Sequence, residues 1–165
     1  MSIKKQTGKS LKEERGSYII ELAIVFPILL LLFVGAAELG RLFYTYNTLA
    51  KATKLGARYL SNQRDITTGT QAEIDARVLK AKSLVVCGYE DCTGGKPSIV
   101  RGLDVSNVNI TLPTGGAVLS SVTVSIQNYT YTPGVFNLSG PTGAAQSAIY
   151  FNLTPGTTVR YMFSG

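Results

Sequence analysis

The stretch "IIELAIVFPILLLLFVGAAEL", residues 19–39, decides the fold of this chain. It is almost entirely apolar, and its only charged residues are Glu21 near the start and Glu38 near the end. As an α-helix, a segment of this length rises about 31 Å, which matches the roughly 30 Å hydrocarbon core of a bilayer. The sequence therefore predicts one membrane-spanning helix, with a kink or local loosening at Pro27.

The residues before this segment predict its orientation. Residues 1–16 contain five of the chain's 16 lysines and arginines, against only two glutamates. Positive flanks tend to stay in the cytoplasm, so we expect the chain after Arg41 on the opposite side of the membrane, which in a bacterium is the periplasm. The pI of 9.4 partly reflects this short basic tail. No basic stripe interleaved with aromatic residues follows, so no nucleic acid partner is expected.

The helical pattern continues beyond the apolar segment. We expect a helix from about Tyr18 to Leu60, because apolar or small residues recur there at spacings of three and four. They are Leu42, Tyr46, Leu49, Thr53, Gly56 and Leu60. The small members make this stripe shallow, and we predict that Leu42, Tyr46, Leu49 and Gly56 pack against a helix of a neighbouring subunit.

The remaining residues predict a small mixed head. Thr70 and Glu73 have the spacing of a capping box, so a second helix is expected from there to the cysteine loop. The period then changes from 3.6 to 2, which predicts strands near 108–112, 122–126 and 159–163. Residues 113–116 are expected to turn, and residues 132–157 to form a long surface loop. The predicted fold class is α+β: a long N-terminal helix (17–61) and a head (62–165) with a second helix and a small antiparallel sheet.

The composition limits the chemistry that the chain can perform. It has no histidine and two cysteines, which excludes histidine-based acid/base catalysis and a structural zinc site of the usual Cys/His kind. Cys87 and Cys92 enclose a short loop and are candidates for a disulfide in an oxidising compartment. We expect no catalytic, cofactor-binding or metal-binding residue, since Glu90 and Asp91 alone make a poor cation site. The chain is predicted not to be an enzyme.

A basic leader ends at Gly16, directly before the apolar helix. Cleavage between Gly16 and Ser17 would create a cationic α-amino group at Ser17, and Glu21 would then be the fifth residue of the mature chain. Such an amine could pair with Glu21 of a neighbouring subunit within lipid and fix the register of the two helices, because an unpaired charge there is costly.

This arrangement resembles the class III leader of type IV-like prepilins. Together with "ELAIVFPILLLLF" (21–33), "ELGRLF" (38–43) and "GARY" (56–59), it is similar to the TadE-like pseudopilins, or minor pilins, of the tight-adherence (Flp, type IVb) pilus systems. The resemblance covers about residues 15–60. It implies a leader (1–16) removed by the prepilin peptidase, an inner-membrane protein with a pilin-like helix and a periplasmic head, and a non-enzymatic role in pilus assembly.

The same resemblance implies the partners. They are the prepilin peptidase, the major Flp-type pilin, other pseudopilins, the inner-membrane assembly platform and membrane lipid, and the protein could enter an extracellular pilus that serves adhesion. No cofactor is implied.

Two other interpretations of the sequence remain open at this point. The apolar segment could be a secretory signal peptide cut near residues 35–37, which would release a soluble periplasmic domain, although Glu21 and Pro27 suit such a segment poorly. The chain could also be a membrane-anchored enzyme that uses carboxylate or serine chemistry. The position of the mature N-terminus distinguishes the first alternative, and the effect of Glu21→Ala distinguishes the second.

Overall fold

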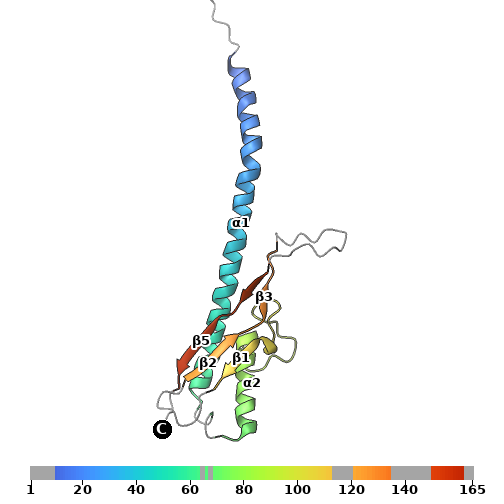
Figure 1. Cartoon of the computed structure of the whole chain (residues 1–165). Helices are drawn as coiled ribbons and strands as arrows, with labels where there is room; N and C mark the ends of the chain where they lie inside the picture. The colour runs from blue at the N-terminus through green and yellow to red at the C-terminus, as the bar shows by residue number, and fades with distance from the viewer. Residues whose placement is uncertain (1–9, 64–65, 67–68, 113–120, 135–149, 162–165) are drawn as a thin grey trace, which may run out of the picture. The chain divides into compact units, whose positions relative to one another are not determined.

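A computed structural model of the chain describes residues 10–63, 66, 69–112, 121–134 and 150–161, and for residues 10–17 it describes the backbone alone. The chain divides into two compact units, Met1–Gly40 and Arg41–Gly165. We call the second unit the head. Helix α1 (Ser10–Ser61) begins in the first unit and ends in the head (Figure 1). The last part of this helix therefore belongs to the compact head, whereas the sequence predicted a head that begins after it.

Helix α1 ends where the sequence predicts but begins eight residues before Tyr18. The earlier start has a local reason, because Leu11–Arg15 consists of leucine, lysine, glutamate and arginine, which all favour helix. The helical assignment continues through Pro27. An 18-residue window of the helix has a mean hydropathy of 2.7 and is 0% buried, so α1 is long and apolar enough to cross a membrane.

Helix α2 (Gln71–Cys87) has a defined cap at each end. The predicted capping box is present: the Glu73 amide donates to Thr70 Oγ1 (3.4 Å), and the Thr70 amide donates to Glu73 Oε2 (2.9 Å). At the other end Gly88 adopts φ +78° and donates its amide to the carbonyl of Leu84 (3.1 Å). Glycine suits this position because a Cβ would be strained at positive φ. The second helix of the sequence prediction is thereby confirmed.

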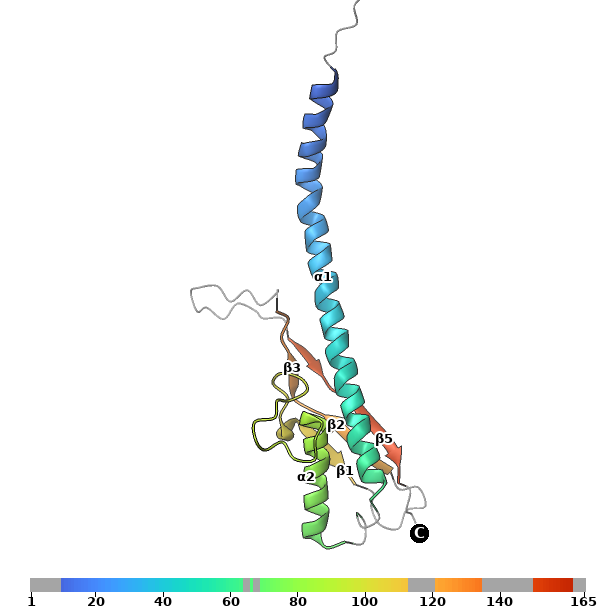
Figure 2. The same cartoon turned by 180° about the vertical axis from the view of Figure 1, so that it is seen from behind.

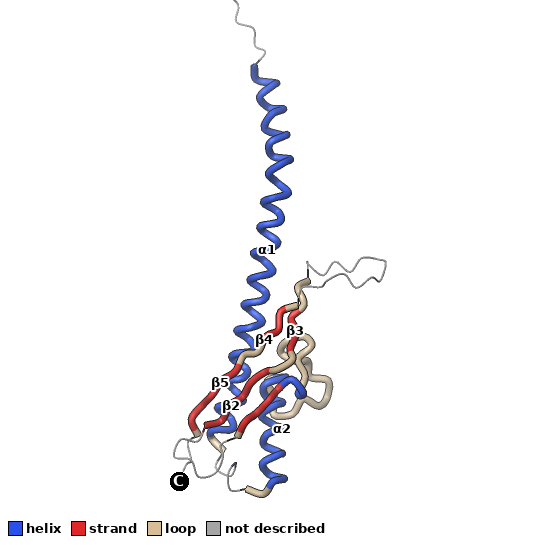
Figure 3. The backbone as a smooth tube through the Cα atoms, viewed as in Figure 1, coloured by secondary structure: helices blue, strands red, loops and turns tan. Residues whose placement is uncertain are grey.

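Five strands form two small antiparallel sheets in the described part of the head (Figure 3). The three-stranded sheet has the order β1-β2-β5, and the two-stranded sheet pairs β3 with β4. The bounds are β1 (Val108–Thr111), β2 (Ser121–Ile126), β3 (Tyr129–Tyr131), β4 (Phe151–Leu153) and β5 (Gly156–Arg160), and a short 3-10 helix, η2 (Val105–Asn107), precedes β1. The structure therefore confirms an α+β fold with small antiparallel sheets.

The expected surface loop at 132–157 is partly wrong. Strand β4 and the start of β5 lie within it, and the described β5 ends at Arg160; residues 162–163 of the predicted strand lie outside the described residues. Pairing across the chain produces these strands, since Asn152 lies opposite Thr130 and Thr157 lies opposite Val124. The predicted turn at 113–116 lies outside the described residues.

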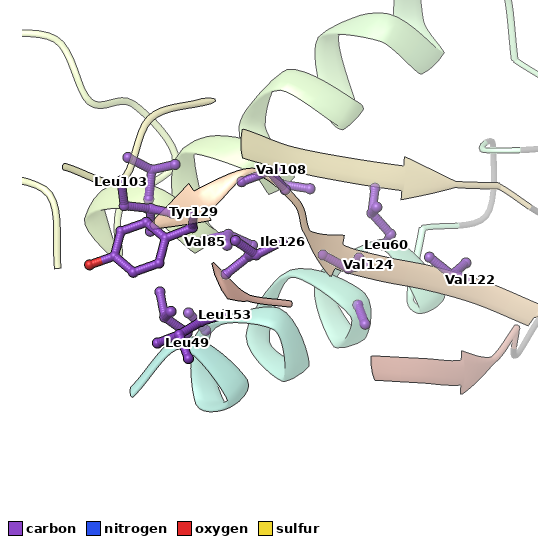
Figure 4. Close-up of a cluster of buried hydrophobic side chains, with 14 of the residues drawn as sticks. Leu49, Leu60, Val85, Leu103, Val108, Val122, Val124, Ile126, Tyr129 and Leu153 are labelled. Atoms are coloured by element: carbon purple, nitrogen blue, oxygen red, sulfur yellow. The ribbon is translucent and has the colours of Figure 1, made fainter. Parts of the chain in front are cut away.

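The core of the head lies between one face of the three-stranded sheet and the two helices, which cover the same side of it (Figure 2). Alternation along β2 sends Val122, Val124 and Ile126 inward, where each is 0% exposed. Leu60 of α1 and Val85 of α2 meet them there and are also fully buried (Figure 4). Full burial of one such side chain contributes about 1.5–3 kcal/mol.

Candidate functional site

The proposed cleavage point, Gly16–Ser17, lies inside α1 in the unit Met1–Gly40. The sequence placed the start of the helix just after this bond, whereas the structure gives the bond a helical backbone. A protease acts on backbone that has locally opened, so cleavage here requires the first turns of α1 to unwind. Glycine lowers the cost of that opening, because it is among the least favourable residues in a helix.

Glu21 lies four residues after Ser17 in α1 and is exposed. Residues four apart occupy the same face of a helix, so a new amine at Ser17 and the Glu21 carboxylate would share one face. Among the ion pairs between described side chains, none involves Glu21.

The described side chains next to Glu21 on α1 are apolar. The large hydrophobic side chains from Tyr18 to Phe33 are between 41% and 76% exposed. A helix that is apolar all round is suited to lipid or to the interior of an assembly. Between Tyr18 and Phe33, α1 thus presents one carboxylate on an otherwise apolar surface.

The stripe predicted to pack on a neighbouring subunit has mainly an internal role. Leu49 is 0% exposed and Gly56 is buried, both within the head. A Cβ on Gly56 would lie 2.6 Å from Val85 Cγ2 of α2, so α2 approaches α1 at this glycine. Leu42 packs against the edge of the core, and Tyr46 is 44% exposed. The expectation of contact with another subunit is therefore corrected for Leu49 and Gly56, because the protein's own head covers them.

The structure joins Cys87, the last residue of α2, to Cys92 in a disulfide with the Cα atoms 5.9 Å apart. Local contacts order the enclosed loop: Lys80 Nζ lies 3.4 Å from Glu90 Oε2, and the Lys96 ammonium lies 4.6 Å from the centre of the Tyr89 ring. This loop is thus tied to the end of α2 by a covalent bond and by side-chain contacts.

Asp91, the second acidic residue of the cysteine loop, is also held locally. Hydrogen bonds from the hydroxyl and the amide of Thr93, with a smaller effect of Lys96, lower the pKa of the Asp91 carboxyl. The acidic pair is thus used for loop structure. No group of three or more potential metal ligands occurs among the residues that the structure describes.

Strands β3 and β4 carry a pocket that the sequence did not suggest. It has a volume of about 330 Å³ and is lined by Thr130, Tyr150 and Asn152. Thr130 lies at least twenty positions before Tyr150 and Asn152 in the sequence, and the pairing of β3 with β4 brings it beside them. The lining offers a hydroxyl, a phenol and an amide, none of which makes a nucleophile-and-base pair.

The decisive comparison concerns the N-terminal helix. Residues 16–58 match the family model described as TadE-like protein. The TadE-like match begins at Gly16 and ends within α1, so it covers the apolar segment and the helix that enters the head. This agrees with the TadE-like resemblance found in the sequence. Neither the curated proteins nor the solved structures contained a match to this chain.

Proposed function

We propose that this chain is a TadE-like pseudopilin, or minor pilin, that acts in the assembly of a Flp-type pilus and performs no catalysis. The observation that carries the proposal is the position of the family match. It begins at Gly16, where the basic leader meets the apolar helix, and spans the membrane-crossing segment. The head lies outside the match, so its own contacts follow from the structure alone.

In this proposal the prepilin peptidase cleaves between Gly16 and Ser17 on the cytoplasmic side of the inner membrane. The new α-amino group is cationic at neutral pH and pairs with Glu21 of an adjacent subunit. Such a pair matters in lipid because each partner alone is a poorly solvated charge. A helix displaced along its neighbour leaves both charges unpaired, so the pair selects one register.

Helix α1 has less surface available for contact with other subunits than the predicted packing stripe implied. The side of α1 that carries Leu49 and Gly56 is occupied by the head. Contacts with the major pilin, with other pseudopilins or with the inner-membrane assembly platform therefore involve the apolar helix of residues 18–33. The head, placed in the periplasm, then moves with the helix to which it is joined.

Substitution of Glu21 tests the assembly role. In a host that carries the complete pilus system, Glu21→Ala should leave cleavage and membrane insertion intact but abolish pilus assembly. Glu90→Ala is the matched control, since it removes one exposed carboxylate from the cysteine loop and leaves α1 unchanged. Normal pilus number with Glu21→Ala would show that the register pair does not exist.

A further inference from the structure

Helix α1 exposes three aromatic side chains directly after its apolar segment. Phe43 is 62% exposed, Tyr44 74% and Tyr46 44%. All three belong to the head unit. At about 100° per residue they spread over roughly 160° of the helix circumference. The described part of the head therefore leaves a broad aromatic surface uncovered on this turn of α1.

The order of residue types along the exposed surface of α1 follows the layers of a bilayer. Large exposed apolar side chains precede Gly40, the exposed Arg41 and then the three aromatic residues follow, and after them Asn47 and Lys51 are exposed. Counted at 1.5 Å per residue, Phe43 lies about 6 Å and Tyr46 about 10 Å beyond Leu39. The headgroup layer on each side of the hydrocarbon core is roughly 5–8 Å thick. Phe43 thus lies within this layer and Tyr46 just beyond its outer edge, close to the depth where tyrosine rings are enriched in membrane proteins.

We propose that Phe43, Tyr44 and Tyr46 form an interfacial belt that binds the headgroup region of the bilayer leaflet from which the head emerges. This inference rests on the proposed membrane-spanning role of α1. Tyrosine suits such a position because its ring packs against acyl chains while its hydroxyl stays hydrated. The belt fixes how far α1 projects from the membrane, and a subunit must withdraw these rings from lipid when it is extracted for assembly.

Tyr89 is also exposed, but its ring has a contact partner within the protein. Tyr89, in the cysteine loop, is 57% exposed, but its ring is covered on one face by the Lys96 ammonium at 4.6 Å. A cation over the ring is a favourable contact within the protein. Tyr89 therefore has a local partner and serves as a matched reference for the belt residues.

The chain contains no tryptophan, so single substitutions give unique fluorescent reporters. The experiment uses the full chain reconstituted in phosphatidylcholine vesicles whose acyl chains are brominated either near the carbonyl end or near the methyl end. Three variants are compared: Phe26→Trp in the apolar segment, Tyr44→Trp in the belt and Tyr89→Trp in the head. Each replaces an exposed aromatic side chain, so the core is not disturbed.

The proposal predicts that Tyr44→Trp loses more emission with bromine near the carbonyl end than with bromine near the methyl end. Phe26→Trp should show the opposite preference, and Tyr89→Trp should lose no emission in either vesicle. If Phe26→Trp is quenched and Tyr44→Trp is not, the belt is wrong while the membrane span stands. If neither is quenched, the membrane span itself is wrong. Protection of Tyr44→Trp from both lipid bromine and aqueous iodide would identify a protein partner as the occupant and overturn the proposal.

Discussion

Thr53 of α1 and Thr157 of β5 share a hydrogen bond of 3.0 Å between their Oγ1 atoms, across 104 positions of sequence. Thr53 Oγ1 also donates to the carbonyl of Ala50 at 3.0 Å, so its single proton is used there and Thr157 is the donor in the shared bond. Thr53 is 0% exposed. This pair ties the end of the long helix to the last strand of the sheet within the head.

Loss of either threonine hydroxyl should weaken the head. We expect Thr157→Val to lower the free energy of unfolding by about 1 kcal/mol, the net value of one hydrogen bond. Thr53→Val should cost at least as much, since it also removes the bond to Ala50. The double variant should cost less than the sum, because the shared bond is lost only once. Urea unfolding of the full chain in detergent, followed by near-ultraviolet circular dichroism, measures these values, and strictly additive effects would contradict the pairing.

Gly56 should not tolerate a side chain. A Cβ at this position would meet Val85 Cγ2 at 2.6 Å, so Gly56→Ala should lower the free energy of unfolding by about 1–3 kcal/mol through overpacking. Gly40→Ala is the control, because nothing lies within 4 Å of its added Cβ. In the background of Val85→Ala, the additional cost of Gly56→Ala should shrink. An unchanged cost in that background would show that α1 and α2 do not meet at this glycine.

Much of this fold could be predicted from the sequence where the signals are local. The capping residues Thr70 and Glu73 are three positions apart, and the structure forms their reciprocal bonds. The sequence did not predict strands β3 and β4, because each has only three residues and β4 follows a stretch rich in Gly, Pro and Ser. Their stability depends on a partner strand at least twenty residues away, which intrinsic strand propensity does not report.

The helical stripe shows a second limit of sequence reasoning. Its period correctly indicated which side of α1 is covered, as the burial of Leu49 and Gly56 shows. The spacing of apolar residues does not show what packs against that side, however. In the structure, the head of the same chain packs there. The sequence could identify Gly16, Ser17 and Glu21 as candidate site residues, because they lie within six consecutive positions and the pattern depends only on their spacing. The pocket at Thr130, Tyr150 and Asn152 could not, since strand pairing assembles it.

The disulfide should contribute to stability in an oxidising environment. On the chain-entropy model, a bridge across five positions contributes about 2 kcal/mol. Replacing both Cys87 and Cys92 by alanine should lower the free energy of unfolding by that amount and increase amide exchange at Ile99, whose amide donates to the carbonyl of Val86 (2.8 Å). A reducing agent should destabilise the native chain and leave the double variant unchanged. Equal responses of the two proteins would mean that the bridge is absent in the native chain.

Tyr129 should make the head sensitive to alkaline pH. Its hydroxyl donates to the carbonyl of Arg101 (3.2 Å), and burial, with a smaller effect of Tyr131, raises the pKa of Tyr129 above its ordinary value of 10.0. A raised folded-state pKa means that this contribution to stability is fully present below pH 10.0 and is lost as the pH rises through the folded value.

Tyr129→Phe tests this linkage. At neutral pH the variant should be less stable by about 1 kcal/mol, for the lost hydrogen bond. Above pH 10.0 the difference between the two proteins should decrease, because only the native side chain ionises. Unfolding curves collected from neutral to alkaline pH measure this difference in the free energy of unfolding. A difference that stays constant across that range would refute the assignment.

The mature N-terminus tests the central claim most directly. Mass spectrometry would identify the first residue of the protein in membranes prepared with and without the cognate prepilin peptidase. The account predicts a chain that begins at Ser17 only when the peptidase is present. A start at Met1 or Ser2 in both samples would contradict it, and a start near Glu38 would instead indicate release from a signal peptide.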